Sequence, residues 1–475
     1  MGDAPPIDCF ADELREEKWG LWEDRYHALT RMIALLQDEV AESAGVNRNR
    51  TFSYLLTQLQ SFAEGQFKFL HQGLDPRPGN GNYLERSLRY PDDFVINSTV
   101  DQVAFDLVVI HGAWNQRILA QNNEPMQRTL QIADQLAYYA LLPALRYQLL
   151  PFEETQVTVL TYFQKAPHIR MIPYAPIALV GIPFTALADY DEDGPRTVGN
   201  AVDLLAIPHE IGHYVYQHGS SKNSRLQNAL YAVLQGQPAW LLNWAEEIFA
   251  DVYGCLIAGP VIVRDFQDLM RDNDVASLIE DDDQHPMPAL RPLLYADVLR
   301  LLAKKAMGDQ KQLARLAEMA EQAESCWKQY LGSRGSQQIE ERRGIIQRAI
   351  ETTFDILTKE NPVSMAGQWS PAGEHDTYNT LYARFYDEVV TGDLFTRLKQ
   401  SEKPSVRKVP PEPTSRWKSP VARIPTLQWL DRIRKNQNQS STKQDRIPTE
   451  VWTLVVSMNG WATDGPQNNP DPKIT

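Results

Sequence analysis

The sequence predicts an α+β protein that is mostly helical and carries one small β-sheet near its middle. Apolar residues recur at three- and four-residue steps over residues 10–43 and 51–71, which is the spacing of an amphipathic helix. Short runs rich in β-branched and aromatic residues follow Pro151 and indicate strands. The charged region 306–358 returns to the helical spacing. Helices on both sides of a short central β region define the fold class.

The composition is that of an ordinary globular protein, with 43% hydrophobic and 23% charged residues. A chain of 475 residues is long enough for two or more domains. The formal net charge of −14 disfavours nucleic acids and anionic membrane surfaces as partners, because phosphate binding requires clustered Lys and Arg. Three widely separated cysteines, Cys9, Cys255 and Cys326, predict no disulfide framework.

The first residues of the chain, 1–15, have neither a basic start nor an apolar core, so we expect no secretory signal. The longest apolar stretches are interrupted by Gly, Pro, Arg or Gln. We therefore expect no membrane-spanning segment, which would need about 18 apolar residues in a row. Together these features predict a cytoplasmic protein.

Four segments are expected along the chain. Residues 1–150 are expected to form a helical N-terminal domain, residues 151–305 a central core, and residues 306–402 a C-terminal helical layer. Residues 403–475 form a Pro-rich linker and an irregular tail, because prolines and basic residues dominate their first part. The further elements expected are helices at 99–121, 124–150, 262–272 and 378–398, and a short strand at 451–456.

Three strands are expected in the core, at residues 156–163, 169–174 and 178–185. Pro183 favours an edge position for the third strand, because proline cannot donate a hydrogen bond to a sheet ladder. An exposed edge can bind an extended peptide as an additional strand. The alternative is an ordinary strand at the margin of the sheet.

The motif His209-Glu210-x-x-His213 carries the strongest chemical signal. On a helix, His209 and His213 stand one turn apart on the same face, where both imidazoles can bind one Zn²⁺ at about 2.0–2.1 Å. Glu210 lies beside them as a base for a metal-activated water. Apolar residues on both sides of the motif predict a buried helix. The alternative is a surface helix with two solvated histidines.

The third ligand is not the histidine of the longer H-E-x-x-H-x-x-G-x-x-H pattern, because Tyr216 and Gly219 occupy its last two positions. A downstream helix offers a better candidate. Its face of polar or small residues comprises Asn243, Glu247, Ala250, Asp251 and Gly254. The small residues let this helix approach the first one closely, so that Glu247 reaches the metal and Asp251 hydrogen-bonds a ligating histidine. Alternatives are Asp251 as the ligand, or an acidic pair on a solvated face.

The two motifs together, His209-Glu210-x-x-His213 and Glu247-x-x-Ala250-Asp251, resemble those of the gluzincin group of zinc metallopeptidases. The resemblance covers residues 170–300. It implies that residues 151–305 form a zincin-like catalytic core, in which a small sheet, the active-site helix and a second helix that donates the glutamate hold Zn²⁺. It also implies peptide-bond hydrolysis and an edge strand that binds the substrate backbone. Pro208 departs from a regular helix, which should begin or bend there.

The resemblance further implies a His, Tyr or Arg beyond the third ligand that donates to the developing oxyanion. His285, Arg291 and Tyr295 are the candidates, and His285 is favoured because Pro286 and Pro288 can hold its imidazole in place.

The predicted function is zinc-dependent hydrolysis of a peptide or protein substrate, with Glu210 as general base and His285 as a second catalytic residue. Two other classes remain open. One is a metal-dependent hydrolase of a non-peptide amide or ester. The other is a binding or regulatory protein with a structural or vestigial zinc site, against which Glu210 argues, because a structural site has no need of a base.

Overall fold

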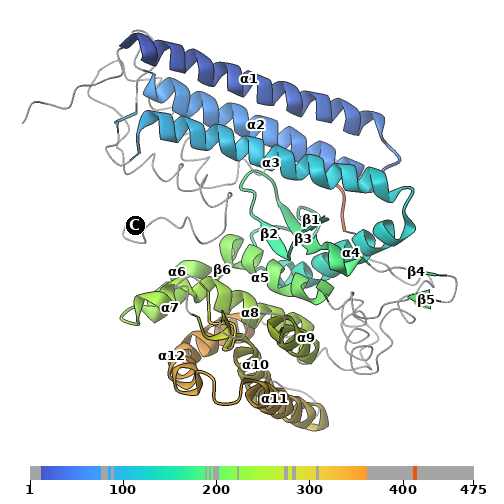
Figure 1. Cartoon of the computed structure of the whole chain (residues 1–475), viewed down its shortest axis with the longest axis vertical. Helices are drawn as coiled ribbons and strands as arrows, with labels where there is room; N and C mark the ends of the chain where they lie inside the picture. The colour runs from blue at the N-terminus through green and yellow to red at the C-terminus, as the bar shows by residue number, and fades with distance from the viewer. Residues whose placement is uncertain are drawn as a thin grey trace, which may run out of the picture. The chain divides into compact units, whose positions relative to one another are not determined.

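The computed structural model describes residues 12–75, 84–86, 90–187, 190–191, 194–195, 203–221, 224–271, 277–280, 285–305, 310–360 and 410–413. These residues are mostly helical and include one three-stranded sheet, which confirms the mostly helical α+β class (Figure 1). The helix expected at 378–398 and the strand expected at 451–456 lie outside the described residues, as does most of the expected linker and tail.

The chain divides into two compact units. Unit 1 comprises Met1–Asn115, Ile172–Pro176 and Glu412–Thr475, and unit 2 comprises Gln116–Met171 and Ile177–Pro411. The first boundary therefore falls inside a helix and differs from the boundary at residue 150 that the sequence suggested.

Unit 1 contains the helices α1 (Asp12–Glu42) and α2 (Asn49–Leu74) and most of α3 (Asp92–Ala120), which lie side by side. Aromatic residues join them: Tyr26 of α1 stacks on Phe67 of α2, with ring centroids 4.2 Å apart. The regular apolar spacing noted in the sequence thus becomes the buried side of a helical bundle.

The helix α3 is long and apolar enough to cross a membrane by length and composition, alone among the described helices. Half of its apolar window is buried inside the protein. A core helix passes the same test of length and composition, so the sequence-based expectation of no membrane-spanning segment stays a prediction. Within unit 1, Trp114 of α3 packs against Phe52 and donates a hydrogen bond of 2.8 Å to Glu39.

The sheet of unit 2 has the strand order β1-β3-β2, with β1 at Thr158–Gln164, β2 at His168–Arg170 and β3 at Ile177–Pro183. β3 pairs in parallel with β1 and antiparallel with β2. The expectation that the third strand lies at the edge is therefore wrong, and β1 and β2 are the edges. Pro183 is tolerated in the central strand because it is the last residue of β3, where the ladder ends.

Two helices pack with the sheet: α4 (Glu124–Arg146) contacts β1, and α5 (Ile207–His218) contacts β2 and β3. Asn123 caps the start of α4 by accepting a hydrogen bond of 3.0 Å from the Met126 amide. Alternate residues of the strands share one hydrophobic core with α4 and α5: Val159, Phe163, Ile169, Ala178, Val180 and Ile182.

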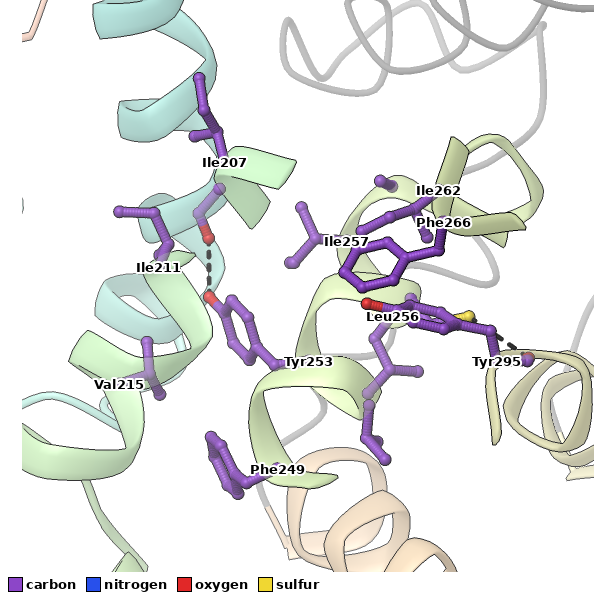
Figure 2. Packing of buried hydrophobic residues seen from close by; sticks show 14 of the residues in the cluster. Ile207, Ile211, Val215, Phe249, Tyr253, Leu256, Ile257, Ile262, Phe266 and Tyr295 are labelled. Atoms are coloured by element: carbon purple, nitrogen blue, oxygen red, sulfur yellow. Dashed lines mark hydrogen bonds between the residues drawn. The ribbon is translucent and has the colours of Figure 1, made fainter. Parts of the chain in front are cut away.

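The helix α8 (Ala245–Ala258) packs against α5 over most of its length. Figure 2 shows Tyr253 and Phe249 of α8 on the side that faces α5, and the Tyr253 hydroxyl donates to the Ala140 carbonyl at 2.6 Å. The remaining helices of unit 2 are α6 (Leu226–Leu234), α7 (Ala239–Asn243), α9 (Pro260–Arg271), α10 (Arg291–Lys305), α11 (Gln310–Leu331) and α12 (Ser336–Asp355). The last two confirm the helical character expected at 306–358.

Unit 2 also contains short elements. They are the 3₁₀ turns Phe184–Ala186 and Ser277–Ile279, the π turn Ile356–Glu360, and the two-residue strands β4 (Tyr190–Asp191), β5 (Gly194–Pro195), β6 (Ser220–Ser221) and β7 (Ser224–Arg225). β4 pairs with β5, and β6 pairs with β7.

The approach of α5 to α8 depends on two glycines. A Cβ atom placed on Gly212 of α5 would lie 2.7 Å from the Ala250 Cα, and one on Gly254 of α8 would lie 3.2 Å from the His209 Cα. Neither neighbour is a flexible side-chain end that can move aside. The backbones of the two helices therefore pack in direct contact, as the small residues at positions 250 and 254 suggested.

We expect Gly212→Ala to destabilise unit 2 by about 1–3 kcal/mol, the usual cost of overpacking a close contact. Gly344→Ala in α12 is the matched control, since a Cβ at that exposed helical glycine would meet nothing within 4 Å. This control should be stabilising by about 0.5–1 kcal/mol. Thermal and denaturant unfolding of both variants measures the difference, and equal effects would contradict the close-contact interpretation.

Candidate metal centre

The helix α5 presents both histidines of the motif from a buried position. It begins at Ile207 with Pro208 in its first turn, where proline costs no intrahelical hydrogen bond, so the expected start near Pro208 is confirmed. Its apolar side enters the core of unit 2. On another side, the imidazoles of His209 and His213 lie with their centroids 4.8 Å apart and their planes nearly perpendicular.

Glu247 of α8 completes a group of three ligand atoms with the two histidines. The Nε2 atoms of His209 and His213 lie 3.2 Å apart. Oxygens of the Glu247 carboxylate lie 3.6 Å from the first and 3.4 Å from the second. Ligand bonds of about 2.0–2.2 Å in a tetrahedral arrangement separate neighbouring donor atoms by about 3.4 Å. The three residues therefore fit one small divalent cation such as Zn²⁺.

Asp251 contacts the opposite side of the His209 ring. Its carboxylate lies 2.9 Å from His209 Nδ1, while Arg291 donates to it through Nε at 3.0 Å and Nη2 at 2.6 Å. The Tyr295 hydroxyl donates to the same carboxylate at 2.9 Å. Burial works against the charge, but Arg291, followed by His209, outweighs it and holds the pKa of Asp251 well below its usual range. Asp251 thus accepts a hydrogen bond from His209 Nδ1–H and leaves Nε2, on the side of Glu247, as the nitrogen that could bind a metal.

Glu246 holds the second histidine in a similar way. One of its carboxylate oxygens lies 3.1 Å from His213 Nδ1. Burial opposes the charged imidazolium, but Glu247, then Glu246 and Glu210, overcome it and raise the pKa of His213 to about 10. The carboxylates therefore create a demand for positive charge at His213 Nε2, which a bound metal cation would satisfy in place of a proton.

The charges around the ligand group are mostly negative. Glu210, Glu247 and Asp251 are buried, with 8%, 7% and 0% of their surfaces exposed. The guanidinium of Arg291 offsets part of this charge, since its Nη2 lies 3.5 Å from Glu247 and 3.3 Å from His209 Nε2. Several buried carboxylates with one nearby arginine form an environment that favours a divalent cation.

The structure brings together five of the residues chosen from the sequence: His209, Glu210, His213, Glu247 and Asp251. Of the three oxyanion candidates, Arg291 and Tyr295 of α10 are both bonded to Asp251. His285 is half-buried in the segment that precedes α10, and its catalytic role stays a prediction.

Sequence reasoning missed two residues near this group. His168 begins the edge strand β2, which contacts α5, and it interacts electrostatically with Glu210, His213 and Glu247. Glu246 was treated only as the neighbour of Glu247, although it contacts His213 directly. A signal for Glu246 existed in the sequence, because a second carboxylate directly before the ligand lies at the start of the same helix.

Comparisons with protein-family models, with curated proteins and with solved structures return no match. The resemblance to gluzincins therefore rests on the two motifs.

A pair of isosteric variants tests whether Glu247 or Asp251 is the metal ligand. We expect Glu247→Gln to lose Zn²⁺, because the amide removes the charged ligand between the two Nε2 atoms. We expect Asp251→Asn to retain Zn²⁺ with an affinity about 10–100-fold lower, the usual cost of losing a group that orients a ligand. Metal content and zinc affinity of the purified variants provide the measurement, with His213→Ala as the metal-free control. The reverse order would make Asp251 the ligand.

Proposed function

We propose that the protein is a zinc-dependent metallopeptidase. The observation that carries the proposal is the convergence of His209 Nε2, His213 Nε2 and the Glu247 carboxylate at distances suited to one Zn²⁺, with Glu210 next to the first ligand. A structural zinc site is normally closed by four protein ligands. Three ligands and an adjacent carboxylate that is not one of them are typical of a catalytic site, which leaves a position for water and substrate.

Each residue then has a distinct task. Zn²⁺, when bound, polarises the substrate carbonyl and lowers the pKa of water. Glu210 accepts a proton as water attacks the carbonyl carbon, and it returns that proton to the leaving amine as the C–N bond breaks. His209, His213 and Glu247 hold the cation, while Asp251 and Glu246 fix the two imidazole rings.

The edge strand β2 supports a peptide as the substrate class. β2 is an edge of the described sheet, it contacts α5, and its first residue lies within the electrostatic field of Glu210 and the ligands. An extended peptide binds such an edge through main-chain hydrogen bonds. A comparison of peptides with small amides and esters as substrates tests this choice, and turnover of the small molecules alone would favour the non-peptide hydrolase.

Glu210→Gln tests the proposed base. The amide keeps the size and shape of the carboxylate but accepts no proton, so peptide hydrolysis should fall by at least about 10²-fold. Zinc should remain bound near one per chain, because Glu210 is not a ligand. Both quantities are measured on the same zinc-loaded preparation, and full activity of this variant would exclude the mechanism.

Loss of the His285 side chain should affect kcat, whereas loss of the Tyr295 hydroxyl should affect zinc affinity. His285→Ala should lower kcat by about 10²-fold with zinc affinity and KM nearly unchanged, because an oxyanion donor acts as charge develops on the substrate. Tyr295→Phe should instead weaken zinc binding, because the Tyr295 hydroxyl is bonded to Asp251. Steady-state kinetics and zinc affinity separate the two. A His285→Ala protein with wild-type kcat would pass the role to another residue.

A further inference from the structure

We propose that Glu246 is a positioning residue that fixes the metal-binding tautomer of His213, and that a chain of amides from α6 holds it there. The proposal rests on the metal site of the proposed function but concerns residues outside the ligand group. The chain runs from Gln227 of α6 through Gln217 of α5 to Glu246 of α8.

The hydrogen bonds of this chain have one direction. Gln227 donates its amide N–H to the Gln217 side-chain oxygen, which leaves the Gln217 N–H groups facing Glu246. Gln217 Nε2 donates to Glu246 Oε2 at 2.6 Å. A carboxylate accepts hydrogen bonds and donates none, so the chain ends on an acceptor.

The other oxygen of the same carboxylate sets the state of His213. Glu246 Oε1 lies 3.1 Å from His213 Nδ1 and offers only an acceptor, so the ring proton resides on Nδ1. Nε2, which lies 3.4 Å from Glu247 Oε1 and 3.2 Å from His209 Nε2, is then the nitrogen that a metal ion would bind in place of a proton. Glu246 thus does for His213 what Asp251 does for His209.

The two orienting carboxylates differ in how they are held. The Asp251 side chain is fully buried and receives three hydrogen bonds from Arg291 and Tyr295. The Glu246 side chain is 30% exposed, and its second oxygen accepts a hydrogen bond from the neutral amide of Gln217. Because Gln217 is itself oriented by Gln227, the position of α6 bears on the orientation of His213.

Exchanging the carboxylate of Glu246 and the amide of Gln217 tests the proposal. In Glu246→Gln, the residue-246 side chain can place its amide N–H groups toward Gln217, where two donors then oppose each other. We expect the Zn²⁺ affinity of this variant to fall by about 10–100-fold. In the double variant Glu246→Gln/Gln217→Glu, the amide oxygen at 246 accepts from His213 while its N–H donates to the new carboxylate. We expect the double variant to recover most of the affinity.

The Zn²⁺ affinity of each full-length protein is measured by competition with a chromophoric chelator, without any substrate present. Glu341→Gln, an exposed charge-matched change in α12, is the control and should bind like the wild type. Gln217→Met tests the chain without altering any group that touches His213, and it should also weaken binding. Circular dichroism of the metal-free proteins shows that each variant is folded.

Each outcome has a separate meaning. A wild-type protein that binds no Zn²⁺ would overturn the metal site itself. Wild-type affinity in Glu246→Gln would overturn the role of Glu246 and leave the metal site intact. A loss in Glu246→Gln without recovery in the double variant would show that restoring the order of donors and acceptors is not enough to orient His213, and would also overturn the proposal.

Discussion

The site depends on the backbone contact between α5 and α8. His209 and His213 come from one helix and Glu247 from the other, so the distance between the helix axes decides whether their ligand atoms meet. Gly212 supplies the contact on α5 and Gly254 supplies it on α8, next to the backbone of His209. Donor atoms spaced 3.2–3.6 Å apart leave little tolerance, since a displacement of about 1 Å is enough to disable a site of this kind.

The same contact gathers negative charge in the protein interior. Burial of several carboxylates is unfavourable unless cations lie near them. Arg291 is the fixed cation, and it is held by two bonds to Asp251. The elevated pKa of His213 shows that the remaining carboxylates still attract positive charge. Packing energy from the surrounding apolar core holds this arrangement together, and a divalent cation at the three ligand atoms would offset part of the buried negative charge.

Much of the site could be predicted because helical phase is a local property of the sequence. The spacing of His209 and His213, the position of Glu247 beside their Nε2 atoms, and the close approach at the small residues 250 and 254 all follow from 3.6 residues per turn. The mostly helical class followed from the same periodicity. These predictions needed no knowledge of which helices are neighbours.

The missed features depend on contacts between segments. Glu246 points toward α5 and Gln217, and the phase of its own helix gives no information about that partner. Arg291 was considered as an oxyanion donor, but two of its donor nitrogens are bonded to Asp251, a contact that pairs α10 with α8. Pro183 suggested an edge strand, whereas position at the end of a strand removes the same penalty. These features depend on which elements are neighbours and on where a strand ends, and the local sequence pattern gives neither.

The carboxylates that orient the two histidines differ in burial and in their hydrogen-bond donors. His209 is held by a fully buried carboxylate that is clamped by a charged and a neutral donor, so its ring has one available orientation. His213 is held by the partly exposed carboxylate of Glu246. This carboxylate accepts a hydrogen bond from Gln217, which in turn accepts one from Gln227. Bonds near solvent are weaker and adjust more easily than buried charged pairs. If the protein acts as the proposed zinc peptidase, a change in metal coordination on substrate binding would therefore be accommodated on the His213 side, while His209 and Glu247 would keep the cation in place.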